Sequence, residues 1–320
     1  MIIDAHAHIF PLVHGRVAAG ATRGLGAGRI AVGDQEMQLM PPAAGPTAFS
    51  AETLLANLDW AGVDRAVLLQ GTFYGECNDY ALDALEAHPD RLAAACYFDP
   101  WSPGSRQRFA EAEPHPFCAL KIEFSDRTGL AGLYPQARLD EPGLAWLWRG
   151  LESAGRALVL DLGRPGDRSY QVGAVASVAR RHPGLKVVLA HLGQPQPEAE
   201  ETPHLWNQWL ELVDLGRLPN VFFDTAALPA LLPREDFPFP SARRYFKLAV
   251  ERVGPAKLMW GTDQPGLLSR LTYTQLLRLG QLHADFLSAR EQAMYLGGNA
   301  ARVYGPPPGR PPATTPKETQ

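Results

Sequence analysis

Short apolar runs alternate with longer amphipathic segments along most of the chain. The runs have the length of strands, whereas the segments between them, such as 50–62 and 78–90, repeat apolar residues at intervals of three and four as helices do. Glycine and proline mark the joins between the two kinds of segment. The predicted strands are 2–6, 65–70, 92–98, 117–123, 156–161, 186–191, 220–224 and 257–263.

This alternation predicts an α/β fold built on a parallel sheet. Strands that are apolar on both faces suit a sheet covered by helices, and eight strand–helix units predict a (β/α)8 TIM barrel. A doubly wound sheet is the alternative that the pattern leaves open. We expect a single barrel domain over residues 1–305.

Two segments depart from the alternation. Residues 11–50, between the first strand and its helix, are too many for an ordinary connection. We expect an inserted flap there, in which 28–42 forms a hairpin around Gly33 and Asp34. Residues 306–320 are rich in proline and polar residues, which predicts a disordered tail.

Ionisable or amide side chains stand at or just beyond the carboxyl ends of the predicted strands. In a TIM barrel these ends meet at one mouth, where the catalytic groups lie. A single aspartate in such a place often caps a helix, but repetition at every strand favours a catalytic or metal-binding site. The residues are His6, His8, Gln70, Asp99, Glu123, Asp161, His191, Asp224 and Asp263.

His6 and His8 are the most informative pair. Residues two apart on a strand share a face, so the two imidazoles converge, with Asp4 below them on the same strand. Two neutral imidazole nitrogens at that spacing suit a divalent cation. Two hydrogen-bonded histidines at a strand end are the structural alternative.

Composition narrows the class of partner. Hydrophobic residues make up 46% of the chain, enough for a sizeable core, and the net charge of −4 disfavours nucleic acid and anionic membranes as partners. Three widely spaced cysteines, Cys77, Cys96 and Cys118, predict buried reduced thiols instead of disulfides. With neither a leader nor an apolar run of membrane length, we expect a cytoplasmic protein that acts on a small molecule, with a homo-oligomer left open.

Several motifs together resemble a known family. "DAHAHIF" (4–10), the segment 68–100, "VVLAHLG" (187–193), "WGTDQP" (260–265) and "GNAARVYG" (298–305) occur in this order. They resemble the amidohydrolase-related proteins of the amidohydrolase superfamily, which include metal-dependent decarboxylases of the aminocarboxymuconate semialdehyde type, lactonases and other hydrolases. The resemblance runs from residue 2 to about residue 305 and implies a TIM barrel of the metal-dependent hydrolase type.

The resemblance also implies roles for single residues. His6 and His8 match the metal ligands of the first strand, and Asp263 matches an aspartate that binds metal and moves a proton. His191 matches a histidine that is a ligand or an acid/base. Asp161 stands where the family usually has a histidine ligand, and its carboxylate makes the ligand set harder.

The expected cofactor is one divalent metal ion. The resemblance gives His6, His8, Asp263 and either Asp161 or His191 as its ligands, with His191 and Asp263 as the catalytic residues. Zinc is the usual ion, whereas the carboxylate of Asp161 favours manganese or iron. Some lactonases of the group work without metal, so the aspartate at position 161 leaves open whether this protein depends on a metal ion.

Gln70, Lys121 and Glu123 are candidates for substrate binding. Gln70 either orients the substrate or forms a hydrogen bond with a loop. Lys121 and Glu123 share a strand face. They are either an ion pair that lines the barrel, or Lys121 binds a substrate carboxylate while Glu123 serves as a further ligand or base.

The flap supplies a second set of candidates. Arg23, with Arg16 and Arg29, lies beside glycines that permit movement, and arginine can grip a carboxylate through two hydrogen bonds. The alternative is a solvated loop whose arginines contact only water.

Three aspartates outside the proposed ligand set receive structural roles. Asp4 is expected to accept a hydrogen bond that orients a ligand imidazole. Asp99 and Asp224 are expected to cap helices or anchor loops.

Three functions remain for a mouth of this kind. A metal-dependent hydrolase would act on an amide, ester or lactone of a small, carboxylated molecule, with the metal lowering the pKa of a bound water. A metal-dependent non-oxidative decarboxylase is the alternative. A barrel that binds a ligand without catalysis is the third, supported only by Asp161.

Overall fold

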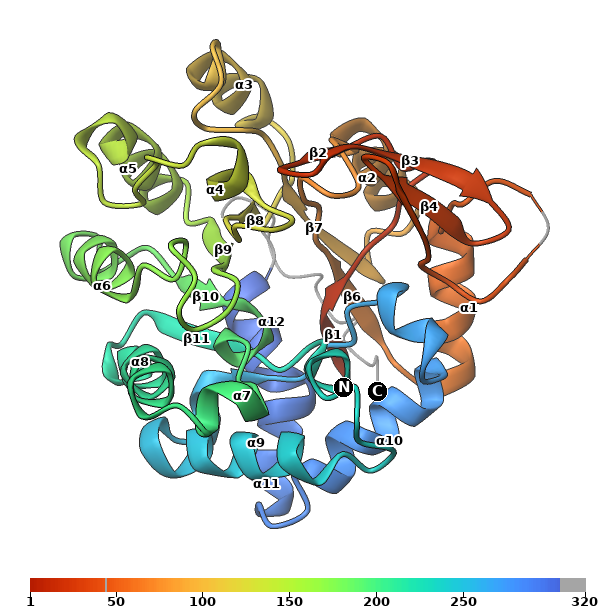
Figure 1. The fold of residues 1–320 in the computed structure, drawn as a ribbon, viewed down its shortest axis with the longest axis vertical. Coiled ribbons are helices and arrows are strands. Elements are labelled where there is room, and N and C mark those ends of the chain that lie inside the picture. The colour runs from red at the N-terminus through yellow and green to blue at the C-terminus, as the bar shows by residue number, and fades with distance from the viewer. Residues whose placement is uncertain (44, 306–320) are drawn as a thin grey trace, which may run out of the picture.

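The computed structural model describes residues 1–43 and 45–305, so the predicted tail at 306–320 lies outside the described residues. Eight strands form one sheet in which each strand pairs with the next in parallel. Helices lie between successive strands and surround the sheet (Figure 1). The predicted TIM barrel is confirmed. The strands are β1 (Ile3–Ala7), β6 (Arg65–Leu68), β7 (Leu92–Cys96), β8 (Ala119–Glu123), β9 (Ala157–Asp161), β10 (Val187–Leu189), β11 (Val221–Asp224) and β12 (Leu258–Met259).

The chain after β12 closes the barrel against β1. The main-chain N–H of Ala5 donates to Trp260, and Ala7 pairs in parallel with Gln264. The register of β1 with β6 shifts between Asp4 and Ala7. This shift turns the strand, so that Asp4 and His6 do not share a face as simple alternation predicts.

The sixth and eighth strands are shorter than predicted. β10 ends at Leu189, and β12 ends at Met259. His191, Leu192 and Asp263, which follow these strands, have positive φ angles of 56°, 52° and 59°. A left-handed residue cannot continue a strand, so the ladder stops and the chain turns toward the mouth.

The main helices cover the outside of the barrel, and the last helix closes the end of the barrel at which the strands begin. Leu120, Ile122 and Leu158 of the strands pack outward against the helices, whereas Val159 and Met259 point inward to meet Val303 and Tyr304 of the last helix. The helices of eight or more residues are α1 (Ala51–Ala61), α2 (Asn78–Ala87), α3 (Ser105–Ala112), α5 (Ala145–Ser153), α6 (Val172–Arg181), α8 (Pro203–Asp214), α9 (Pro240–Val253) and α10 (Tyr273–His283). The shorter ones are α4 (Leu130–Leu133), α7 (Pro197–Glu200), α11 (Ala289–Ala293) and α12 (Asn299–Tyr304).

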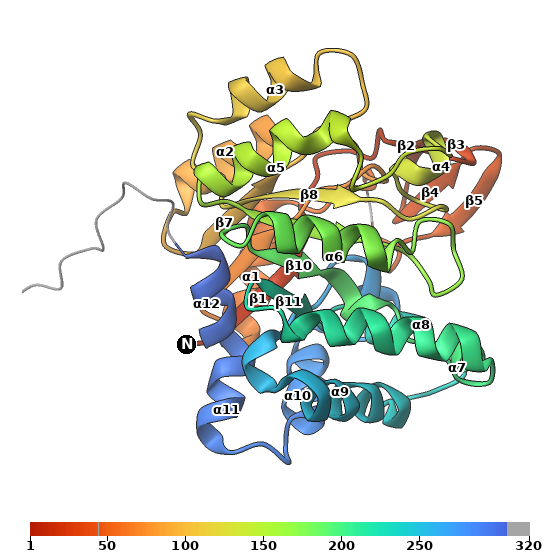
Figure 2. The same cartoon turned by 90° about the vertical axis from the view of Figure 1, so that its left-hand side faces the viewer.

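The segment between β1 and α1 forms a small antiparallel sheet at the end of the barrel opposite α12 (Figure 2). Its strands are β2 (Arg16–Val17), β3 (Gly20–Gly26), β4 (Arg29–Val32) and β5 (Gln35–Gln38). The predicted hairpin around Gly33 and Asp34 is confirmed, because Val32 pairs with Gln35. β2 and β3 were not predicted.

The structure also answers two compositional predictions. Cys77, Cys96 and Cys118 are buried free thiols, as predicted. Among the described residues, no helix has both the length and the apolar character needed to cross a membrane.

Candidate active site at the mouth of the barrel

Side chains from six strand ends meet at the mouth. His6 and His8 come from β1 and the residue after it, and Lys121 and Glu123 come from β8. All of the mouth residues are buried except Asp263, whose side chain is 25% exposed. Asp161 of β9, His191 after β10, Asp224 of β11 and Asp263 after β12 complete the group.

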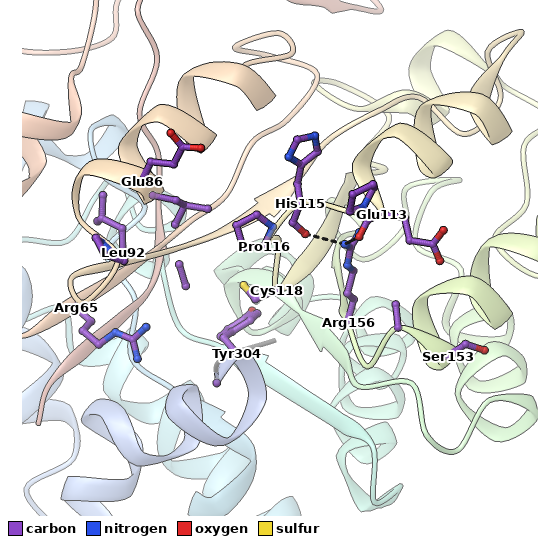
Figure 3. A pocket seen from close by; sticks show the side chains of 16 residues that line it. Arg65, Glu86, Leu92, Glu113, His115, Pro116, Cys118, Ser153, Arg156 and Tyr304 are labelled. Carbon is purple, nitrogen blue, oxygen red and sulfur yellow. Dashed lines mark hydrogen bonds between the residues drawn. The ribbon is translucent and has the colours of Figure 1, made fainter. Parts of the chain in front are cut away.

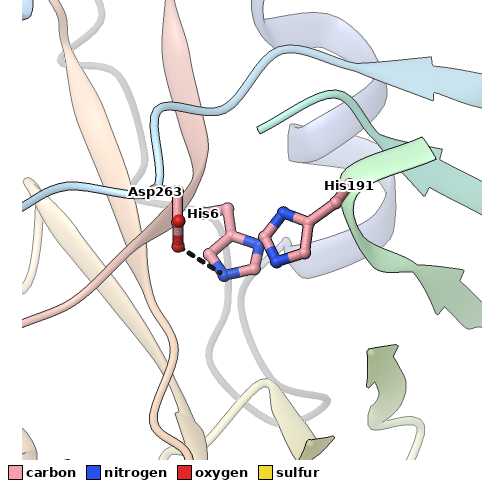
Figure 4. A group of neighbouring side chains, drawn as sticks. All are labelled: His6, His191 and Asp263. Carbon is pink, nitrogen blue, oxygen red and sulfur yellow. Dashed lines mark ion pairs between the residues drawn. The ribbon is translucent and has the colours of Figure 1, made fainter. Parts of the chain in front are cut away.

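Asp263 stands against the histidines of β1. Its Oδ1 lies 2.9 Å from Nε2 of His8 and 3.5 Å from Nε2 of His6. The ring of His191 lies 4.7 Å from the ring of His6. Figure 4 shows His6, His191 and Asp263, which come from three separate strands and face one another.

The backbone at this site is held in an unusual conformation. His191 and Asp263 both have left-handed backbones, which for residues other than glycine cost about 1–2 kcal/mol each. The N–H of Asp263 donates to the carbonyl of His6 at 2.7 Å, which fixes its position. Gly261 packs closely here, because a Cβ there would lie 3.0 Å from Cβ of His6 and would push that side chain aside.

Asp224 orients the imidazole of His6 and fixes the main chain of His191, a role that differs from the predicted cap or loop anchor. Its Oδ2 lies 3.0 Å from Nδ1 of His6, and its Oδ1 accepts the main-chain N–H of His191 at 2.9 Å. His191 Nδ1 lies 3.2 Å from the carbonyl of Ala226, and His8 Nδ1 lies 2.6 Å from the carbonyl of Leu69. With each Nδ1 engaged in this way, the three Nε2 atoms face the mouth.

The predicted role of Asp4 is wrong. Its carboxylate accepts the N–H groups of His6 and Thr262 and the hydroxyls of Thr262 and Tyr273, but no imidazole. The register shift in β1 explains this, because it places Asp4 on the outer face, toward α10. Burial raises the pKa of Asp4 to about 6, although the hydrogen bonds lower it in part.

The pKa values of Asp263, His6 and His8 are all lowered, which favours the charged form of the carboxyl group and the neutral forms of the two imidazoles. Burial alone would raise the pKa of Asp263, but the hydrogen bond from His8 and the charges of His191 and His6 hold it well below its usual range. Burial lowers the pKa of His6 and of His8, and the charge of Lys121 adds to that effect. Asp263 is therefore held as the carboxylate, while burial favours the neutral form of His6 and of His8.

His191 differs from the other two histidines. Burial alone would lower its pKa, but the charges of Asp161, Asp263 and Asp224 outweigh burial and raise it. His191 is thus the imidazole of the mouth that is most easily protonated.

Lys121 and Glu123 both point into the barrel, but they are not the predicted ion pair. Lys121 Nζ lies 3.2 Å from Nε2 of His6, and no ion pair joins Lys121 to Glu123 among the residues that the structure describes. Burial, with a contribution from Asp161, raises the pKa of Glu123 to about 7. Gly71 makes room for Glu123, because a Cβ on Gly71 would lie 2.5 Å from its Oε2.

Asp161 lies at the edge of the mouth. Its Oδ1 accepts the N–H of Gly163 at 3.0 Å and Nε2 of Gln194 at 2.8 Å. Its Oδ2 lies 3.6 Å from Nε2 of His191. The structure therefore brings Asp161 to His191 and leaves one oxygen facing that imidazole.

Gln70 and Asp99 are bound within the protein. The amide of Gln70 accepts the N–H of Cys77 and donates to Asn78 and to the carbonyl of Ala95, which is the loop-anchoring alternative. Asp99 accepts from Trp101 and Tyr134, so it anchors a loop as predicted.

The flap arginines do not reach the histidines. Arg16, Arg23 and Arg29 are exposed, and Arg29 pairs with Glu36. On β3, Thr22 is buried and donates to the carbonyl of Phe73, so Arg23 faces the opposite way. The three arginines are therefore exposed on the flap, as in the solvated alternative, although Arg29 also contacts Glu36.

Tyr74 is the residue of the mouth that the sequence analysis missed. Its ring lies 4.9 Å from the ring of His8. Burial raises the pKa of Tyr74 well above its ordinary value, and the carboxylates of Asp263 and Glu123 raise it further. Its position just after the second strand was the only sequence signal that could have identified it.

The donor atoms at the mouth fit a divalent metal ion. Ligand atoms of His6, His191 and Asp263 all lie within 4.8 Å of one another, and imidazole and carboxylate are ligands of zinc. The predicted ligand His8 contacts Asp263, and Asp161 contacts His191, but neither belongs to this group of three. Lys121 would give up its contact with His6 when an ion binds, because both use Nε2.

A cavity of about 810 Å³ opens at the other end of the barrel, beside the starts of β6 to β9 (Figure 3). Arg65, Cys118, Arg156 and Tyr304 line it. Arg156 donates to the carbonyls of Ala112, Glu113 and His115, and so caps the end of α3. This end of a TIM barrel serves stability, whereas the mouth serves chemistry.

The fold is a TIM barrel, and polar side chains gather at the carboxyl ends of its strands, where TIM-barrel enzymes place their active sites. The chain belongs to the amidohydrolase family, whose profile, described as Amidohydrolase, matches residues 3–305.

Three known proteins illustrate the relationship. An L-fucono-1,5-lactonase of Burkholderia ambifaria is 30% identical over 140 residues, or 41% of this chain and 45% of that protein, so the match spans less than half of this curated relative. An amidohydrolase of Burkholderia multivorans, solved with bound zinc, is similar in fold, with a TM-score of 0.71 at 21% identity over 96% of this chain and 100% of that one. A probable 2-pyrone-4,6-dicarboxylic acid hydrolase of Acinetobacter baumannii, solved with citric acid, has a TM-score of 0.67 at 18% identity over 95% of this chain and 99% of that one.

Proposed function

We propose that this protein hydrolyses a lactone, the cyclic ester of a small hydroxy acid. The observation that carries the proposal is the Asp263 carboxylate, which stands at the mouth among three histidines. Ester hydrolysis needs a group that takes a proton from water and positive charge beside the acyl oxygen. Asp263 is suited to the first task, and His191 and Lys121 are suited to the second.

The similar proteins support a cyclic ester over an amide. The Burkholderia ambifaria relative is named a lactonase, and a 2-pyrone is also a cyclic ester. The citric acid bound to the Acinetobacter baumannii protein is consistent with a carboxylated substrate. We therefore propose a lactone that bears hydroxyl or carboxyl groups.

The reaction can be written with the residues of the mouth. Asp263 takes a proton from water as the water oxygen adds to the acyl carbon. Negative charge develops on the acyl oxygen, and Lys121 and His191 place positive charge beside it. When the ring C–O bond breaks, Asp263 returns its proton to the leaving alkoxide, and the product is an open-chain hydroxy acid.

We propose one divalent metal ion as the cofactor, with zinc as the first candidate. His6, His191 and Asp263 would hold it, and His8 and Asp161 would lie beside it. His191 would then be a neutral ligand, and Lys121 would be the positively charged side chain beside the acyl oxygen. A bound ion would supply Lewis acidity at the acyl oxygen and lower the pKa of water. The bound zinc of the Burkholderia multivorans protein supports this choice.

The test is a panel of five- and six-membered lactones of sugar acids, followed by the proton release that ring opening causes. We expect turnover by the wild-type protein and a loss of about 10³-fold in kcat for Asp263→Asn, because an amide cannot accept the proton. Asp34→Asn, on the exposed flap hairpin, is the matched control.

Two further measurements complete the test. Dialysis against a chelator followed by added zinc measures how far turnover depends on metal, and elemental analysis measures metal content. Unsaturated carboxylic acids with carbon dioxide detection test the decarboxylase alternative. Carbon dioxide release that Asp263→Asn abolishes, with every lactone untouched, would overturn the proposal.

A further inference from the structure

The loop that follows the second barrel strand is built to hold one aromatic ring. Gly71 and Gly75 pair across it, with the N–H of Gly75 donating to the carbonyl of Gly71 at 3.1 Å. Gly75 has a φ of 97°, a conformation that favours glycine, and a Cβ there would lie 2.8 Å from the ring of His14. Tyr74 sits within this tight turn.

The ring of Tyr74 is held by three other rings. It stacks on Phe10 at 4.5 Å with an interplanar angle of 14°, and it meets Phe73 edge-on at 5.3 Å. Its third neighbour is His8, at 4.9 Å. Because His8 bonds to Asp263, the phenol lies beside the proposed reaction centre.

The flap fastens this loop in place. The N–H groups of His14 and Arg16 donate to the carbonyls of Tyr74 and Thr72, at 3.0 and 3.1 Å. The hydroxyl of Thr22 donates to the carbonyl of Phe73 at 2.7 Å. Three consecutive carbonyls of the loop thus accept from the flap, which gives the inserted sheet a function other than supplying arginines.

Most tyrosine hydroxyls of the described residues have a hydrogen-bond partner, whereas those of Tyr74, Tyr80 and Tyr304 have none, and of these three tyrosines Tyr74 is the one at the mouth. Tyr134 donates to Asp99, Tyr170 to the carbonyl of Gly193, and Tyr273 to Asp4. Within residues 1–43 and 45–305, the hydroxyl of Tyr74 has no hydrogen-bond partner, although the side chain is half-buried. An ordered, half-buried phenol with an unused O–H suits a ligand, because folding alone does not employ the donor.

We propose that Tyr74 is a catalytic residue that donates a hydrogen bond from its hydroxyl to the acyl oxygen of the substrate. This inference rests on the proposed lactone hydrolysis. The donor stabilises the oxygen as it gains negative charge, and the ring that carries it is already held in place before the substrate arrives. A phenylalanine at this position would keep the ring contacts and remove only the donor.

The experiment compares Tyr74→Phe with wild type on the lactone that wild type turns over best. We expect kcat to fall about 10²-fold while KM changes less than about 3-fold, because the hydrogen bond strengthens in the transition state. The thermal midpoint should stay within about 2 °C, since a single hydroxyl without a protein partner is lost. Tyr80→Phe, on α2, is the matched control and should leave kcat unchanged.

A six-membered sugar lactam, which presents an acyl oxygen but resists hydrolysis, separates this inference from the proposed function. By calorimetric titration, Tyr74→Phe should bind the lactam about 5–10-fold more weakly than wild type. If wild type opens no lactone but lactam binding depends on Tyr74, the proposed function fails and the hydrogen bond stands. Equal lactam affinity in the two proteins, or equal kcat, overturns the role of Tyr74.

Discussion

Glu123 shows how far burial changes a single side chain of this protein. It lies on the inner face of β8, and its pKa is raised from an ordinary 4.5 to about 7. Between these two values the folded protein holds a proton that the unfolded chain has released. This residue therefore contributes stability that is complete below about pH 4.5 and is lost as the pH rises through 7.

Glu123→Gln should therefore stabilise the protein in alkaline solution. An amide of the same shape never ionises, so the burial of a carboxylate, on the order of 3 kcal/mol, is avoided. We expect a thermal midpoint about 5 °C above wild type at pH 8.5 and nearly equal midpoints at pH 4.5. Differential scanning calorimetry at both pH values measures this, and an equal shift at both would refute the titration of Glu123.

The sequence predicts which residues lie at the mouth better than it predicts their hydrogen-bond partners. A polar side chain at the carboxyl end of an apolar strand is visible in one dimension, so His6, His8, Lys121 and Asp263 were found. Tyr74 was missed because an aromatic residue in a loop gives no periodic signal.

The aspartates show the same limit. Asp4 and Asp224 exchanged their predicted roles, because a hydrogen-bond partner more than 200 residues away in sequence depends on packing. The sequence pattern places a carboxylate at a strand end, but it does not show which neighbouring strand supplies the hydrogen-bond donor.

Strand β1 is the element on which the site depends most. Its register shift separates the face of Asp4, which binds Thr262 after the last strand and Tyr273 of α10, from the face of His6, which enters the mouth. A strand pattern predicts strict alternation, so this shift could not be predicted from the sequence.

Asp4→Ala should destabilise the barrel at its seam. The change leaves the N–H groups of His6 and Thr262 and two hydroxyls without their buried acceptor, a loss of about 3 kcal/mol or more. Denaturation by urea should show a lower midpoint, whereas Asp90→Ala, on the exposed surface, should match wild type. An unchanged midpoint for Asp4→Ala would contradict the role of this carboxylate in closing the barrel.

The whole barrel was predictable because its pattern is repeated eight times. Each apolar run needs helices on its outer face, and the repetition makes a chance pattern improbable. The flap was harder to predict, since its short strands are mostly exposed and carry little hydrophobic signal. Only the hairpin with Gly33 in its turn was visible.

The reactivity of the three buried thiols measures whether the molecule is folded. Burial raises the pKa of Cys77 to about 11 and those of Cys96 and Cys118 to about 12, so the reactive thiolate is scarce at neutral pH. A maleimide should label none of them in the native protein and all three in denaturant, as counted by mass spectrometry. Rapid labelling of native protein at any of these positions would contradict their burial.

Two of the three hydrogen bonds that attach the flap to the loop come from main-chain N–H groups, and this affects how the protein can diversify; the third needs the hydroxyl of Thr22. A hydrogen bond between an N–H group and a carbonyl does not depend on the side chain, so any residue except proline at position 16 keeps the bond to Thr72. Exposed flap positions such as Arg23 and Met37 can vary as well. Natural sequence variation or a library of variants can therefore change the exposed surface of the flap, while the loop that the flap holds stays in place.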